Sequence, residues 1–342
     1  MADAPGMDMR ICGEVDCVLR VRIGEESMRR EIRTRRGELL GIYSHFDPGM
    51  IFRSGQMHHY TMWDPDTKKI LEPREESQRA GYGLTFVAMG RARSFLVKEN
   101  SITLDVTVEE WEKVWVPYFD LTTNYSMIHE NLAENAIMRD VLRIGDGLRI
   151  LKQDPYETII EFILSQNANI PRIRRSLEAI ARLYGSRLFT SEGVPGQYYS
   201  LPEAEILSGI AAEDLREKAR VGYRDRYLTE SAQMLAESRI NLQKCYIGEL
   251  SEAKKELQRL PGVGPKVADC ILLFGFGRKE AFPVDVWIRQ VMQEVFLKRE
   301  LPPARIERAG RALFGQYAGI AQQMLFFAAR EGYSFPVDSI FR

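Results

Sequence analysis

Two residues in this sequence could carry out chemistry together: Lys266 and Asp285, which lie nineteen positions apart. Lys266 follows a Gly-Val-Gly turn and precedes an apolar stretch, so its stem is expected to be buried while its amine stays at the solvent end of a helix. Asp285 follows a Pro-Val pair at the expected start of another helix. A positioned primary amine can act as a nucleophile, and a nearby carboxylate can stabilise the positive charge that its attack creates.

The segment before and after the turn is expected to form a helix, a hairpin and a second helix over residues 251–278. Ser251 is a suitable N-cap for a first helix that ends at Leu260. Pro265 fits the first position of the second helix, where a missing N–H costs nothing.

The turn itself contains Gly262 and Gly264, two residues apart. Glycines in a tight turn leave main-chain N–H groups unpaired and unshielded by side chains. Amides of this kind at a helix N-terminus bind phosphate oxygens, so the expected partner is DNA. The alternative is a hairpin that uses the glycines only for its own geometry.

Asp285 is expected to cap a third helix, in which Trp287, Val291 and Val295 belong to a broad apolar face. Taken alone, an aspartate in this position is more often a simple helix cap than a catalytic group. Its spacing from Lys266 makes the pair more specific than either residue.

The Gly-Val-Gly hairpin, Lys266 and the Pro-Val-Asp segment ending at Asp285 together resemble the helix-hairpin-helix, Gly/Pro-Asp superfamily of DNA glycosylases. The Val-Ala-Asp-Cys string ending at Cys270 is similar to the 8-oxoguanine DNA glycosylase branch. The resemblance implies a bifunctional enzyme of base excision repair, which flips 8-oxoguanine out of duplex DNA and excises it. Lys266 would attack the sugar C1′ and form a Schiff base, and β-elimination would then nick the strand; Asp285 would stabilise charge on the sugar.

The nucleophile needs a neutral amine, yet a free lysine has a pKa of about 10.4 and is protonated at neutral pH. The positive end of the helix dipole and partial burial both disfavour an ammonium ion. The sequence therefore predicts that the pKa of Lys266 is lowered.

A strong helix start, with Asp154 as cap and Glu157 at the third position, precedes an amide-rich segment at residues 165–172. Amides between helices usually cap main-chain groups. The segment nevertheless resembles the family element that fills the space left by an extruded base. That resemblance implies that Asn167 and Arg172 contact the opposite base.

The Gly-Tyr-Arg-Asp-Arg-Tyr string at residues 222–227 interleaves aromatic and basic side chains. Aromatic faces stack on bases and guanidinium groups bind phosphates, which suits a wedge at a kinked duplex; the alternative is an ordinary helix start. The string is similar to the wedge loop of the family, and this implies that Tyr223 and Arg224 bind DNA.

The base pocket is expected from three parts of the chain. Gln322 and Phe326 lie four residues apart on one helix face, where an aromatic residue ordinarily belongs to the core. Their surrounding string resembles the pocket wall of the family, in which the Phe stacks on the flipped base and the Gln reads its Watson–Crick edge. By the same resemblance Cys270 and Phe274 belong to the pocket, and the carbonyl of Gly55 accepts the N7 proton that distinguishes 8-oxoguanine from guanine.

Three positions depart from the family pattern. Trp287 stands where some members have a histidine, and it is expected to make a different phosphate contact. Phe274 replaces a smaller pocket residue, and Ala168 replaces an asparagine in the amide-rich segment. A bulkier pocket and a relaxed preference for the opposite base are expected, and Trp287 favours a bacterial or archaeal member.

The fold class expected is α+β, because strand-like patterns precede helical ones. Residues 1–10 are expected to be disordered, and residues 11–120 to form a β-rich domain whose strands, including one at 18–23, make one antiparallel sheet. Residues 121–342 are expected to form the helical domain. The family resemblance implies a sheet domain like that of the TATA-binding protein.

The composition is that of an ordinary globular protein, with 45% hydrophobic residues and a formal net charge of -1 over 342 residues. DNA affinity must therefore come from local placement of charge. The four cysteines, Cys12, Cys17, Cys245 and Cys270, are too scattered for a disulfide framework or a zinc site with paired ligands. Because no cysteine follows Cys270, no iron–sulfur cluster is expected. No other cofactor or metal is expected, although hairpin carbonyls could hold a structural cation.

The first residues are acidic and lack an apolar core, so neither a secretory signal nor a transit peptide is predicted, and no stretch is apolar enough for a membrane helix. The expected location is the cytoplasm and nucleoid of a prokaryote, or the nucleus of a eukaryote, and the expected state is a monomer. Two other functions stay open: a DNA-binding scaffold that uses only the hairpin, and a glycosylase for another lesion such as an alkylated purine. The second is disfavoured because monofunctional relatives lack the lysine.

Overall fold

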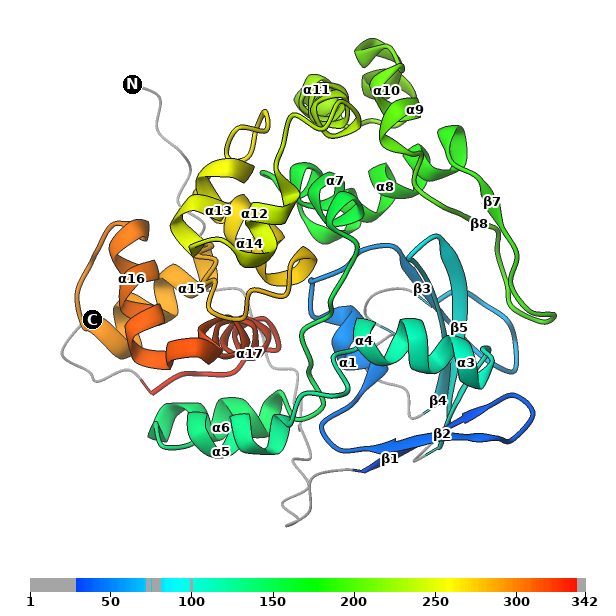
Figure 1. Cartoon of the computed structure of the whole chain (residues 1–342). Helices are drawn as coiled ribbons and strands as arrows, with labels where there is room; N and C mark the ends of the chain where they lie inside the picture. The colour runs from blue at the N-terminus through cyan, green and yellow to red at the C-terminus, as the bar shows by residue number, and fades with distance from the viewer. Residues whose placement is uncertain (1–28, 72–74, 76–80, 99–100, 337–342) are drawn as a thin grey trace, which may run out of the picture.

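The computed structural model describes residues 29–71, 75, 81–98 and 101–336. Within them a six-stranded sheet stands beside a larger helical part, with strands first in the chain and helices after (Figure 1). The predicted α+β class is confirmed. The predicted disordered segment 1–10, the predicted strand at 18–23, Cys12 and Cys17 lie outside the described residues.

The sheet has the strand order β2-β1-β6-β5-β4-β3. Its strands are β1 (Arg30–Thr34), β2 (Leu39–Tyr43), β3 (Tyr60–Trp63), β4 (Gly81–Ala88), β5 (Arg91–Lys98) and β6 (Ser101–Leu104). The prediction of a purely antiparallel sheet is wrong for one pair, because β1 and β6 are parallel, with Ile32 opposite Ile102. Between them the chain passes through helix α1 (Pro48–Arg53) and the β3–β4–β5 meander, a connection long enough to return β6 in the direction of β1.

Aromatic residues from the sheet and from the following helical turns form the core of this domain. Phe86 and Phe95, neighbours on β4 and β5, stack with ring centroids 5.6 Å apart. Trp115 and Phe119 pack edge-on against Phe86 at 5.1 and 5.9 Å. Such offset and edge-on contacts are the favoured geometries of aromatic pairs, so this cluster fixes the helical turns onto one face of the sheet.

The helical part begins at α3 (Val108–Glu110). It continues with α4 (Val116–Tyr118), α5 (Tyr125–Leu132), α6 (Ala136–Ile144), α7 (Pro155–Ser165), α8 (Ile170–Tyr184), α9 (Ala204–Ser208), α10 (Ala212–Lys218), α11 (Asp225–Ala236), α12 (Leu242–Ile247), α13 (Leu250–Leu257), α14 (Pro265–Gly275), α15 (Val286–Val291), α16 (Pro303–Phe314) and α17 (Ala318–Arg330). Two π-helical stretches, Trp111–Trp115 and Met292–Leu297, and two 3₁₀ turns, Gly222–Arg224 and Gly315–Tyr317, adjoin them. A small hairpin, β7 (Arg187–Leu188) and β8 (Tyr198–Tyr199), follows α8.

The helix starts that position the site agree with the sequence in part. Asp154 caps α7 by accepting from the Glu157 amide at 3.0 Å, as predicted, but the Glu157 carboxylate accepts from Met89 instead of closing a capping box. Ser251 is not the cap of α13, which begins at Leu250 without a side-chain cap. The helix ends at Leu257, three residues before the predicted end. The amides of Arg259 and Leu260 bond to carbonyls three residues earlier, as in a 3₁₀ turn, so the α-helix does not continue.

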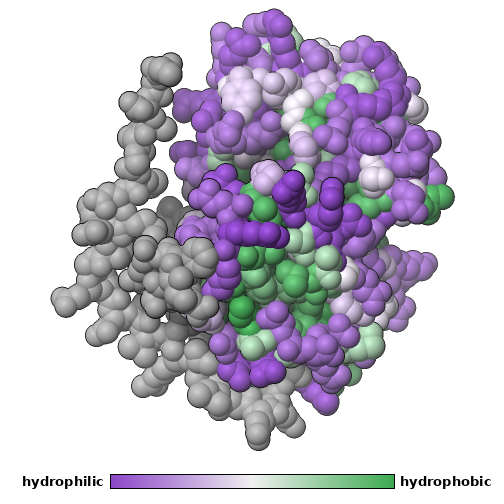
Figure 2. All heavy atoms as spheres, turned by 90° about the vertical axis from the view of Figure 1, so that its left-hand side faces the viewer, coloured by the Kyte–Doolittle hydropathy of each residue, from purple (hydrophilic) through white to green (hydrophobic). Residues whose placement is uncertain are grey.

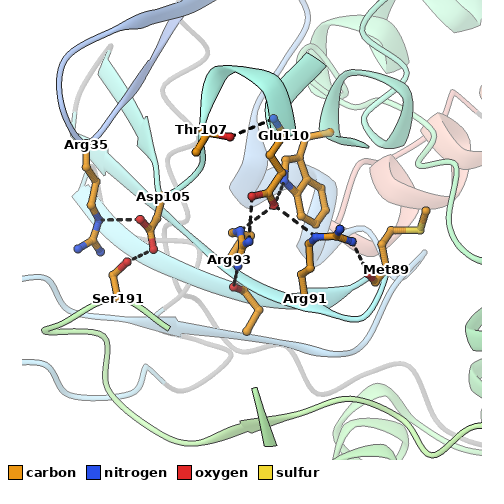
Figure 3. A network of polar contacts seen from close by, with 10 residues as sticks. Arg35, Met89, Arg91, Arg93, Asp105, Thr107, Glu110 and Ser191 are labelled. Atoms are coloured by element: carbon orange, nitrogen blue, oxygen red, sulfur yellow. Dashed lines mark hydrogen bonds and ion pairs between the residues drawn. The ribbon is translucent and has the colours of Figure 1, made fainter. Parts of the chain in front are cut away.

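A polar network ties the β7–β8 hairpin and the α3 turn to the sheet (Figure 3). Asp105 at the end of β6 accepts from Ser191 of the hairpin and lies 4.0 Å from Arg35. Arg93 on β5 forms a two-pronged ion pair with Glu110 at 2.8 and 2.9 Å, and Trp115 donates to the same carboxylate at 2.9 Å. Paired hydrogen bonds of this kind hold geometry well, so the hairpin and the α3 turn are fixed on the sheet.

On the face drawn in Figure 2, a patch of apolar residues is surrounded by polar ones. On α15 the predicted apolar face is buried at Val291, but Trp287 is 48% exposed and Val286 is 70% exposed. The expectation that Trp287 belongs to the buried face is therefore wrong.

None of the helices in the described part of the chain is both long and apolar enough to cross a membrane.

Candidate active site

A cavity of about 740 Å³ lies where the loop after α1, the end of α7, the start of α14, the start of α15 and α17 meet. Six of the predicted site residues line it: Gly55, Asn167, Lys266, Asp285, Trp287 and Phe326. The sheet domain supplies only the loop that contains Gly55, and helices supply the rest. The structure thus brings the amine, the carboxylate and the aromatic wall into one space.

Lys266 is the second residue of α14, which begins at Pro265 as predicted and has Gly264 at its N-cap. Its amine lies 5.6 Å from the centre of the Phe162 ring and hydrogen-bonds to the side chain of Cys270, one helical turn further on. Phe162 in turn stacks on Phe274 at 5.5 Å with the rings nearly parallel. An aromatic stack therefore supports the amine from below.

The charge state of Lys266 differs from the prediction. Burial lowers its pKa, but the negative charges that Cys270 and Asp285 can carry raise it, and the net pKa lies above the ordinary value. Burial also raises the pKa of the Cys270 thiol to about 11. The predicted lowering is wrong for the free protein, because the two acidic groups beside the amine together outweigh desolvation.

Asp285 is the N-cap of α15, as predicted, and one of its oxygens accepts from the Ile288 amide at 2.8 Å. Burial raises the pKa of this carboxyl, while the main-chain bond from Ile288 and the charge of Lys266 oppose the rise. Because the Ile288 amide fixes one oxygen of Asp285, the side chain is held in one orientation at the cavity wall.

The Gly55 wall is held from both sides. Gly55 has φ of +81°, a conformation that favours glycine. Just before it, the carbonyl of Ser54 accepts from Gln323 of α17 at 2.9 Å. Just after it, the side chain of Gln56 donates to the Arg149 carbonyl at 2.9 Å and accepts from the Leu151 amide at 2.8 Å. The loop is thereby fixed between the sheet and the helices.

A side chain at Gly55 would point into the cavity. An added Cβ would lie 3.2 Å from the Arg330 guanidinium and 3.5 Å from the Phe326 ring. For the base excision predicted from the sequence, we expect Gly55→Ala to lower kcat/KM by about 10-fold to 100-fold, since the base would be displaced from its wall. Single-turnover base release measures the effect.

The matched control for this substitution is Gly37→Ala, in the β1–β2 turn. Gly37 has φ of +87°, and an added Cβ there would meet nothing within 4 Å. Both variants should lose about 1 to 2 kcal/mol of stability from backbone strain, but only Gly55→Ala should lose activity. An equal loss of activity in both variants would contradict a role for Gly55 in the pocket.

Cys270, Phe274 and Gln322 were predicted to face the base, but these three side chains do not line the cavity. They lie behind its walls: Cys270 contacts Lys266, and Phe274 supports Phe162. Gln322 on α17 is only 4% exposed, and its side-chain oxygen is buried without a hydrogen-bond partner in the described structure. A buried, unpaired acceptor so close to the cavity can be satisfied by a ligand.

The amide-rich turn and the 222–227 segment meet at the mouth of the cavity. Asn167 has φ of +46° and donates to the hydroxyl of Tyr223 at 3.1 Å, and Tyr223 is 50% exposed. Asn169 caps α8 through the Arg172 amide at 3.0 Å, which is the ordinary role of such amides. Arg172 reaches the same place, since its guanidinium would lie 3.2 Å from a Cβ on Gly222.

Arg224 does not lie at this surface. It is 2% exposed, and its guanidinium donates to the carbonyls of Val221 and Gln166 and stacks on the Tyr223 ring. The prediction that Arg224 contacts DNA is therefore corrected: it holds the two segments together and supports Tyr223 from below.

The two hairpin glycines have different surroundings. Gly262 has φ of +79°, and a Cβ on it would lie 2.5 Å from the Tyr227 ring, so the residue is required by close packing. Gly264, the N-cap of α14, has nothing within 4 Å of such a Cβ. The helix N-terminus is thus open to a partner at Gly264, as phosphate binding requires.

Phe162, His58 and Arg330 are among the lining residues that were not predicted from the sequence. Phe162 looks like any apolar residue of α7, and His58 is placed only by its 3.0 Å contact with Glu161. Arg330 could have been found, because it follows Phe326 by one helical turn and its guanidinium lies 5.4 Å from that ring. Burial lowers the pKa of Arg330.

Comparison with known proteins finds matches to two family models. Residues 40–159 match the family model of the 8-oxoguanine DNA glycosylase N-terminal domain, and residues 160–316 match that of the HhH-GPD superfamily of base excision DNA repair proteins.

Two relatives are similar over most of their length. A probable N-glycosylase/DNA lyase of Methanothermobacter thermautotrophicus is 33% identical, over 65% of this chain and 74% of its own. The N-glycosylase/DNA lyase of Saccharomyces cerevisiae is 32% identical, over 81% of each chain.

A similar solved structure is that of Clostridium acetobutylicum 8-oxoguanine glycosylase/lyase in complex with double-stranded DNA containing cytosine opposite 8-oxoguanine. It superposes with a TM-score of 0.75 at 29% identity and covers 85% of this chain and 93% of that one.

Proposed function

The chain belongs to the N-glycosylase/DNA lyase family of helix-hairpin-helix 8-oxoguanine glycosylases, and we propose that it excises 8-oxoguanine from duplex DNA and nicks the abasic strand through Lys266. The observation that carries the proposal is the single cavity shared by Lys266, Asp285, Phe326 and Gly55. Its walls combine a nucleophile, an acid group and an aromatic face, which are the parts that bond cleavage at an extruded nucleotide requires.

Lys266 acts as the nucleophile after it loses a proton. Its nitrogen forms a bond to C1′ as the bond from C1′ to the base breaks and the base leaves with the electron pair. Opening of the sugar ring then gives a Schiff base, and loss of a C2′ proton breaks the bond to the 3′ phosphate. Asp285 stabilises the positive charge that develops on the sugar during the first step, from a position that α15 fixes in advance.

The damaged base is held between several groups of the pocket. Phe326 offers a ring for stacking. Gln322 lies behind the wall, and its unpaired buried oxygen can accept from the Watson–Crick edge only once the bound base has displaced that wall. The carbonyl of Gly55 accepts the N7 proton, which guanine lacks, so guanine leaves this carbonyl unpaired and is rejected. Asn167, Arg172 and Tyr223 hold the duplex at the space left by the base, and the phosphate backbone is bound at Gly264.

No iron–sulfur cluster is part of this proposal, because the four cysteines are widely spaced and none follows Cys270. A structural cation at the hairpin would use main-chain carbonyls; those of Leu260 and Gly264 accept from Val263 at 3.1 Å and from Ala268 at 2.9 Å, and each oxygen has a second lone pair. We propose that the protein acts as a monomer on duplex DNA with oxidised guanine, in the nucleoid of a prokaryotic cell.

Base-release assays on matched duplexes test the proposal. The duplexes carry 8-oxoguanine, guanine or 3-methyladenine at one position, and release and nicking are measured in parallel. The expected result is release and nicking with 8-oxoguanine and neither with guanine. Release of 3-methyladenine without nicking would overturn the proposal in favour of an alkylated-purine glycosylase, and binding without release would favour a scaffold.

The pH dependence follows from the raised pKa of Lys266. Below this pKa the amine is protonated, and its reactive fraction rises about tenfold per pH unit. The pH dependence of kcat/KM reflects groups that ionise in the free enzyme. We therefore expect kcat/KM, followed by borohydride trapping, to keep rising from neutral into alkaline pH. DNA affinity is measured at each pH as a control, and a plateau near pH 7 would contradict the raised pKa.

A further inference from the structure

A second cluster of polar side chains lies away from the cavity, at the junction of the sheet and the helices. It consists of His45, between β2 and α1, His129 on α5 and Asp146 just after α6. Each offers one ligand atom, and these atoms all lie within 4.8 Å of one another. The described structure contains no other group of three such side chains in this arrangement.

The contacts within the cluster leave one possible ligand atom, Nε2 of His129, without a hydrogen bond. His45 lies 2.5 Å through its Nδ1 from the Asp146 carboxylate and 3.1 Å through its Nε2 from the Ser126 hydroxyl. The rings of His45 and His129 are 4.2 Å apart. The Nε2 atom of His129 is buried and has no hydrogen-bond partner in the described structure, so a polar atom that normally needs a partner lacks one.

The chemistry of the three groups suits a borderline divalent cation. Two imidazole nitrogens and one carboxylate oxygen are common zinc ligands, at about 2.0 to 2.2 Å from the metal. Tetrahedral ligands are then about 3.3 Å apart, which side-chain adjustments of roughly 1 Å can reach.

The neighbouring cation, Arg149, does not compete for this space. Its guanidinium donates to the carbonyls of His45, Ser44, Asp120 and Thr123, at 2.9, 3.0, 2.7 and 3.4 Å, and lies over the ring of Tyr125. Its hydrogen-bonding capacity is thus spent on main-chain oxygens, and the same bonds fix the backbone that carries His45.

We propose that His45, through Nδ1, His129 and Asp146 bind one Zn²⁺ ion, with a water molecule as the fourth ligand, while Ser126 keeps its contact with Nε2 of His45. The site has a structural role and is independent of the excision chemistry. It joins a loop of the sheet domain to the two helices α5 and α6, which a polar contact between His45 and Asp146 alone would do more weakly.

The place of the site gives the ion a mechanical role. His45 leads directly into α1 and the Gly55 wall, and Asp146 follows the end of α6, which packs on α17. The packing is close, since a Cβ on Gly145 would lie 3.4 Å from Met324. A bound ion would therefore connect the supports of two walls of the base pocket, the Gly55 loop and α17.

The test is metal binding by the full chain after removal of any affinity tag and dialysis against a chelator. Zn²⁺ is titrated in competition with a chromophoric chelator, and thermal melting is followed with and without Zn²⁺. The variants are His129→Ala and Asp146→Asn. The matched control is Asp140→Asn, an exposed carboxylate on α6 that pairs with Arg143 at 3.0 Å.

The expected result is one tightly bound Zn²⁺ per chain in the wild type and the control, with affinity at least about 100-fold weaker in both variants. Zn²⁺ should also raise the melting temperature of the wild type and the control by several degrees but not that of the variants. Because the metal-free melting temperatures are compared as well, a folding defect is recognised directly. Equal Zn²⁺ affinity in wild type and both variants, or no tight binding by the wild type, would overturn the proposal.

Discussion

Lys266→Gln should abolish covalent trapping and strand nicking, with the rate of base excision falling by at least about 10³-fold. Glutamine keeps much of the volume over the Phe162 ring but has no nucleophilic nitrogen, so C1′ is left without an attacking group. Single-turnover excision and borohydride trapping on an 8-oxoguanine duplex measure the two losses. Binding to the same duplex should be retained, because the hairpin and the loop at residues 166–172 are unchanged.

The matched control is Lys255→Gln on α13, where the lysine is exposed and lies outside the cavity. This variant removes the same charge close to the hairpin and should trap DNA as the wild type does. If Lys266→Gln formed as much covalent adduct as the wild type, another amine would be the nucleophile and the assignment would be wrong.

Asp285→Asn should slow excision by about 10²-fold to 10³-fold while leaving DNA binding nearly unchanged. Asparagine is also a good N-cap and can still accept from the Ile288 amide, so α15 is expected to stay in place. What is lost is the negative charge that faces the sugar. The measurement is kcat for base release under saturating enzyme, together with thermal melting.

Asp285→Ala separates the two roles of this residue. It removes the charge and the cap together and should cost about 1 kcal/mol of stability in addition to the same loss of rate. A rate for Asp285→Asn equal to that of the wild type, with both proteins folded, would show that the carboxylate serves only as a helix cap.

The sequence was informative where chemistry and local structure coincide. Two predictions that depend only on neighbouring residues are confirmed: Asp285 is the N-cap of α15, and α14 begins at Pro265. That Lys266, Asp285 and Phe326 share one cavity followed from a resemblance that extends over most of the chain. No local rule would have brought Phe326 to the other two.

The errors have physical reasons that a linear pattern does not contain. Arg224 was expected at the surface, but its side chain is buried because the turn at residues 166–169 packs over it. The pKa of Lys266 depends on the balance between burial and two acidic neighbours, and only coordinates give that balance. β6 pairs in parallel with β1 because of a long connection, which strand patterns leave undetermined.

His58 and the His45 cluster were missed for a related reason. The partner of His58 is Glu161, and the partners of His45 are His129 and Asp146. All of these partners are distant in the sequence, so no ligand spacing is visible. The cysteine-based argument against metals applied only to closely spaced ligands, and it gave no information about sites assembled by the fold.

The loop at Gly55 belongs to the sheet domain yet is fastened to α17 through Ser54 and Gln323. In the proposed mechanism, bond breaking and lesion choice therefore belong to different halves of the polypeptide: the helices carry the amine and the acid, and a loop of the sheet domain supplies the carbonyl that would test the base. Lesion preference could consequently diverge between relatives by changes in this one loop, while the catalytic pair stays as it is.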